Sequence, residues 1–584
     1  MSILSESLVS RISGWDATTE AEEETLAPAG NISYVRGGSR PGLAYITVPQ
    51  LLREAVARFG PREAAVFCEQ GVRLSYYDLD RAVDELASGL LALGLETGDR
   101  VGIWAPNCYE WVLTQFATAR VGLVLVTINP AYRVAELEYA LNKVGCKALI
   151  SAPGFKGSDF KAMLHQLAPE LSHCAPGRLQ AARLPHLRSV VVTGDDPGPG
   201  AHSFDQLRRL GGPAQLLRLP AIDRMLDPDD AINIQFTSGT TGHPKGAVLS
   251  HYNIVNNARF VTDRIRLGET DRLVIPVPLY HCFGMVMGVL GVISKGATMV
   301  FPSAGFDAEA TLDAVEAERA TALYGVPTMF VAMLEALEAR PRNLSTLRTG
   351  IMAGAPCPVE VMQKVTAQMH MSEVTICYGM TETSPVSFQS FVHDPIDRRC
   401  ETVGRVHPHL EVKLVGSDGR IVPLGTEGEL CTRGYSVMKG YWDDPDTTAA
   451  SITDGWMRTG DLAVLDAEGF CAIVGRVKDM ILRGGENISP REIEEYLITH
   501  PSVSDVQVFG IPDDRLGEVV CAWAVPRPGQ ALEAEELRRF CQGQIAHFKV
   551  PQHIRIVDEL PVTVTGKAQK FVMRARMIED LGLA

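Results

Sequence analysis

A short loop rich in glycine, serine and threonine decides the fold of this chain. It reads Thr237-Ser238-Gly239-Thr240-Thr241-Gly242-His243-Pro244-Lys245-Gly246, after an apolar run at Ala231–Phe236 and before a helical pattern that begins at Ser250. The glycines permit tight turns, so that backbone N–H groups can converge on phosphate oxygens, while the hydroxyls add donors and Lys245 adds a positive charge. The pattern therefore predicts a phosphate-binding loop that leaves a buried strand.

This loop is not a Walker A motif. That motif requires Ser or Thr directly after the lysine, whereas Gly246 follows Lys245 here. A P-loop kinase or GTPase is disfavoured, and the plain alternative to phosphate binding is a surface turn of small polar residues.

Outward from the loop, helical and strand-like patterns alternate to about residue 400. The helical patterns cover Val48–Phe59, Asp80–Leu93 and Tyr109–Arg120, and the strand patterns cover Ala64–Phe67, Arg100–Trp104 and Val121–Ile128. Such alternation predicts α/β layers around largely parallel strands.

The pattern of predicted secondary structure changes after residue 400. Short strands punctuated by glycine, such as Glu411–Val415 and Gly428–Thr432, predict a small antiparallel barrel or sheet at about 400–475. Beyond it, Ser489-Pro490-Arg491-Glu492 predicts a capping box at the start of a helix, and strands are expected at Val506–Gly510 and Val519–Val525.

The expected fold class is α/β. Residues 1–45 form a loosely ordered lead-in, 46–477 form a large N-terminal domain of layered α/β subdomains with the antiparallel β portion, and 478–584 form a small mobile α+β domain. A chain of 584 residues is too long for one hydrophobic core, which agrees with this division.

The composition limits the function classes. The chain is 46% hydrophobic and 21% charged, as is usual for a soluble globular protein, and its net charge of −15 disfavours bulk attraction to nucleic acid or to anionic membranes. No apolar run approaches the roughly 20 residues of a transmembrane helix. The first 20 residues are acidic and lack an apolar h-region, and the twelve cysteines form no CxxC pair, so we expect a reduced, cytoplasmic protein.

Further motifs follow the loop in a characteristic order. They are Gly354-Ala355-Pro356, Tyr378-Gly379-Met380-Thr381-Glu382, Gly455-Trp456-Met457-Arg458-Thr459-Gly460-Asp461, Gly475-Arg476-Val477-Lys478-Asp479 and Gly566-Lys567. With the loop, and with Leu74-Ser75-Tyr76 near the start, this order resembles the adenylate-forming superfamily of acyl-CoA synthetases, peptide-synthetase adenylation domains and beetle luciferases.

The resemblance assigns roles within a nucleotide site. It implies that residues 237–242 and Lys245 bind the phosphates of ATP, with Thr237 among the catalytic residues. Tyr378 would stack on adenine beside Gly354, Ala355 and Pro356, next to Gly379, and Thr381 would donate to the α-phosphate. Glu382 would hold Mg²⁺, which in ATP sites takes one or two carboxylates together with phosphates and waters.

Three further residues complete the implied site. Asp461 would accept hydrogen bonds from the ribose hydroxyls, since a carboxylate can take two at once. Arg476 would lie near the ribose and α-phosphate. Lys567, on the mobile domain, would neutralise charge in the adenylation transition state.

The family carries out two half-reactions by rotating its small domain about a hinge. A carboxylate first attacks the α-phosphate of ATP and releases pyrophosphate, and a thiol then takes the acyl group and releases AMP. Lys478 occupies the hinge position, and Gly485 could let the pantetheine arm of coenzyme A pass close to the backbone.

We expect a fatty-acyl-CoA synthetase for medium- to long-chain acids. His281-Cys282-Phe283-Gly284 resembles a motif that lines the carboxylate and acyl site, which makes His281 a catalytic candidate, and Phe283, Met285 and Met287 could form an apolar wall. The partners are then a small carboxylic acid, ATP and coenzyme A. The alternatives are a ligase that loads a carrier protein in trans, a luciferase-like oxygenase, and a catalytically inactive ligand-binding homologue.

Overall fold

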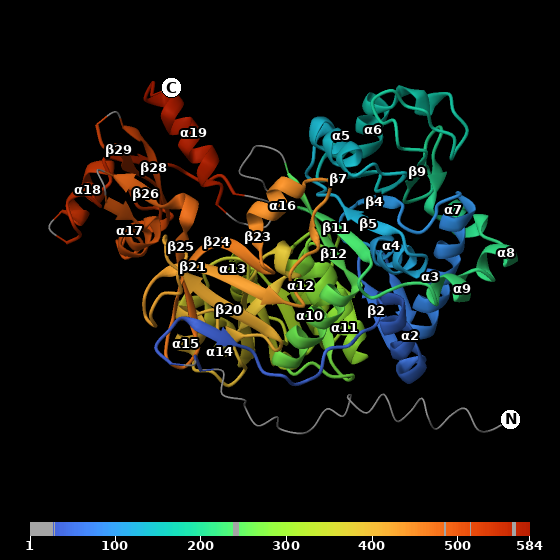
Figure 1. Ribbon diagram of the computed structural model, residues 1–584, viewed down its shortest axis with the longest axis horizontal. Coiled ribbons are helices and arrows are strands. Elements are labelled where there is room, and N and C mark those ends of the chain that lie inside the picture. The colour runs from blue at the N-terminus through green and yellow to red at the C-terminus, as the bar shows by residue number, and fades with distance from the viewer. Residues whose placement is uncertain are drawn as a thin grey trace. The chain divides into compact units, whose positions relative to one another are not determined.

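The computed structural model describes residues 27–28, 30–237, 244–483, 486–513, 515–542, 544–562 and 568–583 (Figure 1). The chain divides into two compact units. Unit 1 consists mainly of Val35–Val412 and Thr432–Met457, and unit 2 mainly of Lys413–Cys431 and Arg458–Ala584.

Unit 1 contains an eight-stranded sheet in which six neighbouring strands run parallel, and at one edge the last two strands each pair antiparallel with the strand before. Its order is β10 (His202–Ser203), β9 (Ser189–Val192), β6 (Ala148–Ser151), β4 (Arg100–Trp104), β5 (Val124–Thr127), β11 (Ala231–Thr237), β12 (Lys245–Ser250) and β22 (Gly440–Tyr441).

The second sheet of unit 1 has nine strands and a parallel centre. Its order is β19 (Arg405–Val406), β18 (Val386–Gln389), β17 (Glu373–Gly379), β16 (Thr349–Ala353), β15 (Ala322–Gly325), β13 (Arg272–Val274), β14 (Thr298–Phe301), β2 (Glu63–Phe67) and β3 (Val72–Ser75). The strands from β17 to β2 are parallel, and the outer strands at both edges are antiparallel.

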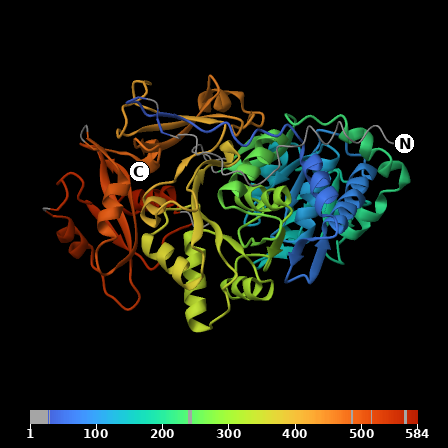
Figure 2. The same cartoon turned by 90° about the horizontal axis from the view of Figure 1, so that it is seen from below.

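Helices cover these sheets, which explains why the central strands are almost continuously apolar. The described helices of unit 1 are α2 (Val48–Phe59), α3 (Tyr76–Ala92), α4 (Tyr109–Arg120), α5 (Val134–Lys143), α6 (Phe160–Leu167), η1 (Pro169–Ser172), α7 (Phe204–Leu210), α8 (Pro213–Leu216), α9 (Leu219–Asp223), α10 (His251–Arg264), η2 (Phe283–Leu290), α11 (Gly291–Lys295), α12 (Ala308–Ala317), α13 (Pro327–Ala339), α14 (Val359–Gln368), η3 (Thr381–Thr383), α15 (Ile396–Glu401) and α16 (Pro445–Ser451). Helix α2 packs on α3, α4, α10 and α11, so helices distant in sequence form one layer, blue beside green in Figure 2.

Unit 2 contains a five-stranded sheet with its own apolar core. The strands are β27 (Glu486–Ile488), β26 (Ile481–Arg483), β29 (Gly517–Pro526) and β28 (Val503–Asp513) in antiparallel order, with β30 (His553–Ile556) parallel to β29. The described α-helices of this unit are α17 (Pro490–Leu497), α18 (Ala534–Cys541) and α19 (Lys570–Asp580). Among the described strands, four carry residues of both units: β1 (Tyr34–Arg36), β20 (Leu410–Val415), β21 (Gly428–Gly434) and β24 (Trp456–Leu465).

The α/β class and the antiparallel portion predicted from the sequence are confirmed. The predicted bounds of α2, β4 and α4 agree with the structure. Helix α3 begins four residues before the predicted Asp80, because the Ser75 side chain accepts from the backbone N–H of Asp78 and caps a turn that buries Tyr76 and Leu79. The domain boundary near Lys478, in the short helix η4 (Val477–Asp479), stays a prediction.

The capping box predicted at Ser489 is wrong. Pro490 does begin α17, but the Ser489 side chain makes no capping hydrogen bond. Its hydroxyl donates instead to the Val474 carbonyl at 3.2 Å, and Glu492 pairs with Lys549. Both side chains bind partners that are distant in sequence, so neither of them caps the helix.

None of the described helices is long and apolar enough to cross a membrane.

Candidate functional site

The candidate site of unit 1 is built on strand ends from both of its sheets. Thr237 ends β11 and Lys245 begins β12, and the two residues lie opposite each other in the antiparallel ladder. In the other sheet, Ala353 ends β16 beside Cys377 of its parallel neighbour β17. Ligands of open α/β sheets bind outside the carboxyl ends of such strands.

A buried carboxylate lies between these strand ends. Glu382 is 6% exposed, in the short helix η3 that follows β17. Its Oε1 atom accepts hydrogen bonds from the Thr237 hydroxyl at 3.3 Å and from the Tyr441 hydroxyl at 2.8 Å. Within the described part of the chain, Oε2 carries no hydrogen bond. The structure thus joins two residues that the sequence analysis selected separately, Thr237 and Glu382.

Tyr441 is a residue of this site that the sequence analysis missed. It ends β22, whose pairing with β12 places Tyr441 opposite Ala247. Burial and the neighbouring Glu382 carboxylate raise the pKa of the Tyr441 hydroxyl, which therefore stays protonated and donates. The Lys245 ammonium lies 5.2 Å from the centroid of the Tyr441 ring. No motif spacing indicated the contact, because 59 residues separate Tyr441 from Glu382.

The residues expected around adenine lie at the ends of neighbouring parallel strands. Gly354, Ala355 and Pro356 directly follow β16 and are exposed, and Tyr378 is half-buried at the end of β17. Gly354 has a φ of +95°, a conformation that side chains with a Cβ rarely adopt. Thr381, the donor expected for the α-phosphate, is half-buried at the first position of η3.

Gly379 is required by close approach of the backbone. A Cβ at this position would lie 1.7 Å from the carbonyl oxygen of Pro385. The glycine therefore lets the chain fold back directly before Glu382 and fixes where the carboxylate lies.

His281 and Cys282 precede η2, which is a π-helix, a form that is frequent at functional sites. Burial lowers the pKa of His281 to about 4, so the imidazole is neutral at pH 7. Cys282 is buried, burial raises the pKa of its thiol, and the thiol donates to Gln235 Oε1 at 3.3 Å. Cys282 is therefore a protonated core side chain.

The apolar wall expected for an acyl chain is only partly accessible. Phe283 is half-buried, and its ring centroid lies 5.4 Å from that of Tyr324. Met285 and Met287 are buried in the core of unit 1. Their role in substrate binding stays a prediction.

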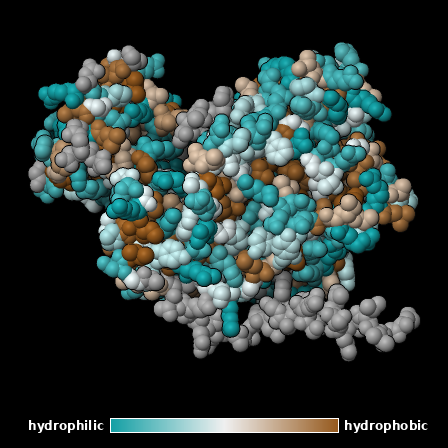
Figure 3. All heavy atoms as spheres, in the orientation of Figure 1, coloured by the Kyte–Doolittle hydropathy of each residue, from teal (hydrophilic) through white to brown (hydrophobic). Residues whose placement is uncertain are grey.

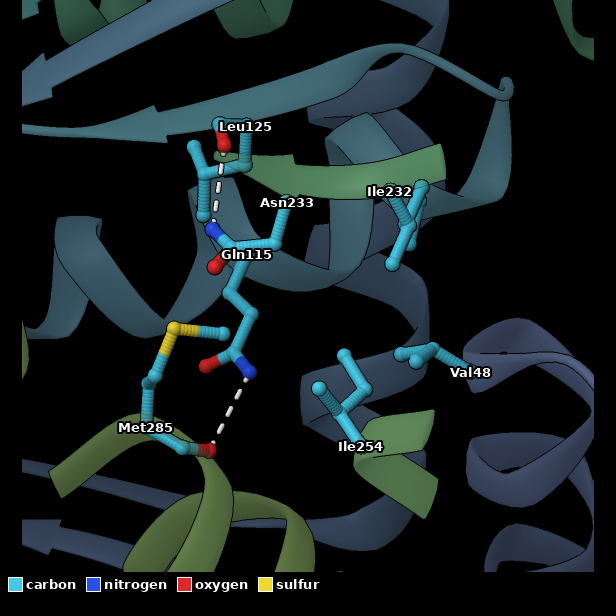
Figure 4. A pocket seen from close by; sticks show the side chains of 8 residues that line it. Val48, Gln115, Leu125, Ile232, Asn233, Ile254 and Met285 are labelled. Atoms are coloured by element: carbon cyan, nitrogen blue, oxygen red, sulfur yellow. Dashed lines mark hydrogen bonds between the residues drawn. The ribbon is translucent and has the colours of Figure 1, made fainter. Parts of the chain in front are cut away.

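A cavity beside Met285 is too small to be an acyl site. It has room for about one water molecule, whereas ligand pockets enclose roughly 300–1,000 Å³. Figure 4 shows Gln115 and Asn233 one above the other next to Met285, donating to the backbone oxygens of Met285 and Leu125. The remaining lining residues are Val48, Ala119, Leu125, Ile232 and Ile254.

Unit 2 brings together two residues selected from the sequence. The neighbouring strands β24 and β25 (Cys471–Arg476) place Asp461 opposite Arg476. Arg476 Nε lies 2.8 Å from Asp461 Oδ1, and the Asp461 side chain is 8% exposed. The ribose role of Asp461 and the phosphate role of Arg476 stay predictions.

Several predicted site residues lie outside the described part of the chain. These are Ser238, Gly239, Thr240, Thr241, Gly242, Gly485 and Lys567.

Comparison with known proteins decides the family. Residues 52–442 match the AMP-binding enzyme family, and residues 492–567 match the AMP-binding enzyme C-terminal domain. This chain is an AMP-binding enzyme. The resemblance to adenylate-forming enzymes predicted from the motifs is thereby confirmed.

Individual AMP-binding enzymes resemble the chain over nearly its whole length. The medium-chain acyl-CoA ligase ACSF2, mitochondrial, of Danio rerio is 48% identical over 95% of this chain and 92% of its own. The anthranilate CoA ligase AuaEII, solved with anthranoyl-AMP, has a TM-score of 0.80 at 25% identity, covering 92% of this chain and 98% of its own. ATP-bound MatB from Rhodopseudomonas palustris has a TM-score of 0.79 at 28% identity, covering 91% of this chain and 99% of its own.

The cytoplasmic location expected from the acidic first residues is wrong by these comparisons. The Danio rerio relative and further mammalian relatives are named mitochondrial. The expectation rested on the first 20 residues, whereas these relatives match 95% to 97% of the chain.

Proposed function

We propose that the chain is a fatty-acyl-CoA synthetase that activates a medium- to long-chain acid. The acid carboxylate attacks the α-phosphate of ATP, which gives acyl-AMP and pyrophosphate. The thiol of coenzyme A then attacks the acyl carbonyl, which gives the thioester and AMP. The observation that carries this proposal is the buried Glu382 carboxylate held between Thr237 and Tyr441, in a chain that aligns with acyl-CoA ligases over nearly its whole length.

The donor set at Glu382 fits Mg²⁺. A carboxylate is a hard oxygen ligand, and in ATP sites Mg²⁺ needs only one or two of these, because phosphates and waters supply the rest. In agreement, no group of three or more His, Cys, Asp or Glu residues is placed to hold a metal by itself in the described ranges. Bound there, Mg²⁺ would offset the charge of the phosphates. Thr237 and Tyr441 donate to Oε1 and orient the Glu382 carboxylate that would hold the cation.

The residues around Glu382 prepare the adenylation step. We assign Lys245 to the phosphates of ATP. It begins β12, directly after the predicted phosphate-binding loop, and its ammonium lies over the Tyr441 ring. The neutral His281 does not add a positive charge at pH 7, so we assign it to orienting the acid rather than to charge neutralisation. We assign the adenine ring to the half-buried Tyr378 and the exposed Gly354–Pro356 at the strand ends.

A ligation screen tests the proposal. The chain is incubated with ATP, Mg²⁺ and coenzyme A, and AMP, pyrophosphate and thioester are measured for straight-chain, branched and aromatic acids. We expect kcat/KM to rise from hexanoate to decanoate, by about fourfold for each methylene buried, since a methylene contributes about 0.8 kcal/mol. A maximum at acetate or at an aromatic acid would contradict the proposed substrate class. Acid-dependent pyrophosphate release without thioester formation would contradict coenzyme A as the acceptor.

A further inference from the structure

A glutamine amide is buried in unit 1, two residues before the candidate site. Polar side chains are usually exposed to water, and Figure 3 shows hydrophilic residues, in teal, over much of the visible face. Gln235, in contrast, is only 2% exposed. It lies on β11, where successive side chains alternate between the two faces of the sheet. Gln235 and Thr237 therefore project from the same face of this strand.

Both ends of the Gln235 amide bind the start of the π-helix η2. The Cys282 thiol donates to Gln235 Oε1 at 3.3 Å, and Gln235 Nε2 donates to the thioether sulfur of Met285 at 3.0 Å. Cys282 and Met285 are buried as well. One side chain of β11 thus holds two residues that are three positions apart at the beginning of the helix.

The same turn of chain carries His281. The His281 carbonyl accepts from the backbone N–H groups of Gly284 at 3.1 Å and of Met285 at 3.0 Å. Its imidazole lies beside the Tyr280 ring, with 4.2 Å between the ring centroids. The position of His281 therefore depends on the turn that Gln235 holds.

This turn lies close to the carboxylate of the candidate site. Burial and the neighbouring Glu382 carboxylate raise the pKa of the Cys282 thiol, which shows that the two groups are near each other. On the other side, the Thr237 hydroxyl donates to Glu382 at 3.3 Å. Strand β11 thus contacts Glu382 through Thr237 and the His281 turn through Gln235.

Stability by itself does not explain the buried amide. A thiol is a weak donor and a thioether is a weak acceptor, so the two hydrogen bonds recover little of the cost of removing the amide from water. Apolar side chains of the same shape would cost less at these positions. They would not fix the turn in one place, however, because apolar contacts have no preferred direction, whereas hydrogen bonds do. The amide therefore supplies position rather than stability.

We propose that Gln235 is a positioning residue that holds His281 in place relative to Thr237 and Glu382. The inference rests on the proposed function, in which His281 orients the acid for attack on the α-phosphate. Such an attack needs the reacting groups in one geometry, and a misplacement of about 1 Å costs up to about 100-fold in rate.

The kinetics of acid activation test the inference. Gln235→Met removes the amide and keeps an unbranched side chain of similar length. For the best acid of the ligation screen, we expect kcat/KM to fall about 10- to 100-fold, while KM for ATP changes less than about twofold because Thr237 still binds Glu382. Cys282→Ala, which lacks the donor, should lose kcat/KM in the same way, and Cys282→Ser, which restores a donor, should recover most of it. An unchanged kcat/KM in an active Gln235→Met enzyme would overturn the inference.

Asn233→Leu is the matched control. Asn233 lies on the same face of β11, is 1% exposed, and donates from its amide to the Leu125 carbonyl of β5 at 3.0 Å. This variant also removes a buried amide, but one that binds a neighbouring strand rather than η2, so its kcat/KM should equal that of the unchanged chain. A loss as large as in Gln235→Met would overturn the inference. Circular dichroism shows which variants fold, and Cys282→Ala carries the test if Gln235→Met does not.

The pKa of His281 gives a measurement that does not depend on catalysis. Burial lowers this pKa to about 4, so the imidazole is neutral at about pH 5.5 in the unchanged chain. A turn released by Gln235→Met admits water, so the pKa of His281 should rise toward about 6.5 in this variant and stay low in Asn233→Leu. Histidine-selective NMR measures it, and His281→Asn identifies the signal. Absence of acid-dependent pyrophosphate release by the unchanged chain would contradict the proposed function, whereas an equal His281 pKa in the two variants would overturn the positioning role.

Discussion

Removal of the Tyr441 hydroxyl tests the central contact of the site. In Tyr441→Phe, the Glu382 carboxylate loses a donor at 2.8 Å and keeps the Thr237 hydroxyl at 3.3 Å. A hydrogen bond to a charged group contributes about 1.5–3 kcal/mol, and an unsatisfied buried group costs a similar amount. We therefore expect the free energy of unfolding to fall by about 1.5–3 kcal/mol without ligand.

The same change should slow adenylation. The hydroxyl holds the carboxylate in one orientation, and misplacement of such a group typically costs up to about 100-fold in rate. Acid-dependent pyrophosphate release at saturating ATP and Mg²⁺ measures the first half-reaction, and urea unfolding measures stability. We expect both to decrease in Tyr441→Phe.

Tyr435→Phe is the matched control for the removed hydroxyl. Tyr435 is also buried in unit 1, and its hydroxyl accepts from the neutral amide of Asn257 at 3.2 Å. This variant should lose only about 0.5–1.5 kcal/mol and should keep its adenylation rate. If Tyr441→Phe is no less stable than the unchanged chain and releases pyrophosphate at the same rate, the hydroxyl does not hold Glu382 as argued.

Three further predictions concern single residues. Gly379→Ala should abolish adenylation and lower the thermal midpoint, because its Cβ would collide with the Pro385 carbonyl; near-normal activity would exclude the required close approach. His281 has its pKa lowered to about 4 by burial, so the unfolded chain binds a proton that the folded chain does not, and stability should fall as pH decreases from about 6.5 to 4. His281→Asn should make urea midpoints less dependent on pH in that window, and an unchanged dependence would contradict a buried neutral imidazole. Lys567→Ala should lose about 100- to 1000-fold in acyl-adenylate formation but convert supplied acyl-adenylate and coenzyme A at a nearly normal rate, and equal loss in both assays would contradict the two-step role.

Much of the fold follows from local sequence. The bounds of α2 agree with its apolar period because Thr47 caps the helix and every inward position packs in the same core. After Arg100, strand β4 is an apolar and buried run because both faces of a parallel sheet are covered. The glycine-rich loop and the ordered motifs likewise indicated the family, since their glycines, hydroxyls, lysines and carboxylates are residue types suited to phosphates and Mg²⁺.

Only the tertiary structure decided which side chains meet. The pairing of β12 with β22 brings Tyr441 to Glu382, and the β24–β25 register brings Arg476 to Asp461. Similarly, the Ser489 hydroxyl donates to the Val474 carbonyl instead of capping the helix that follows it. Local patterns report how a segment is buried, but a hydrogen bond between distant residues depends on strand order and register. A one-residue change of register would turn Tyr441 or Arg476 to the other face of its sheet, which is why their partners emerge only from the folded chain.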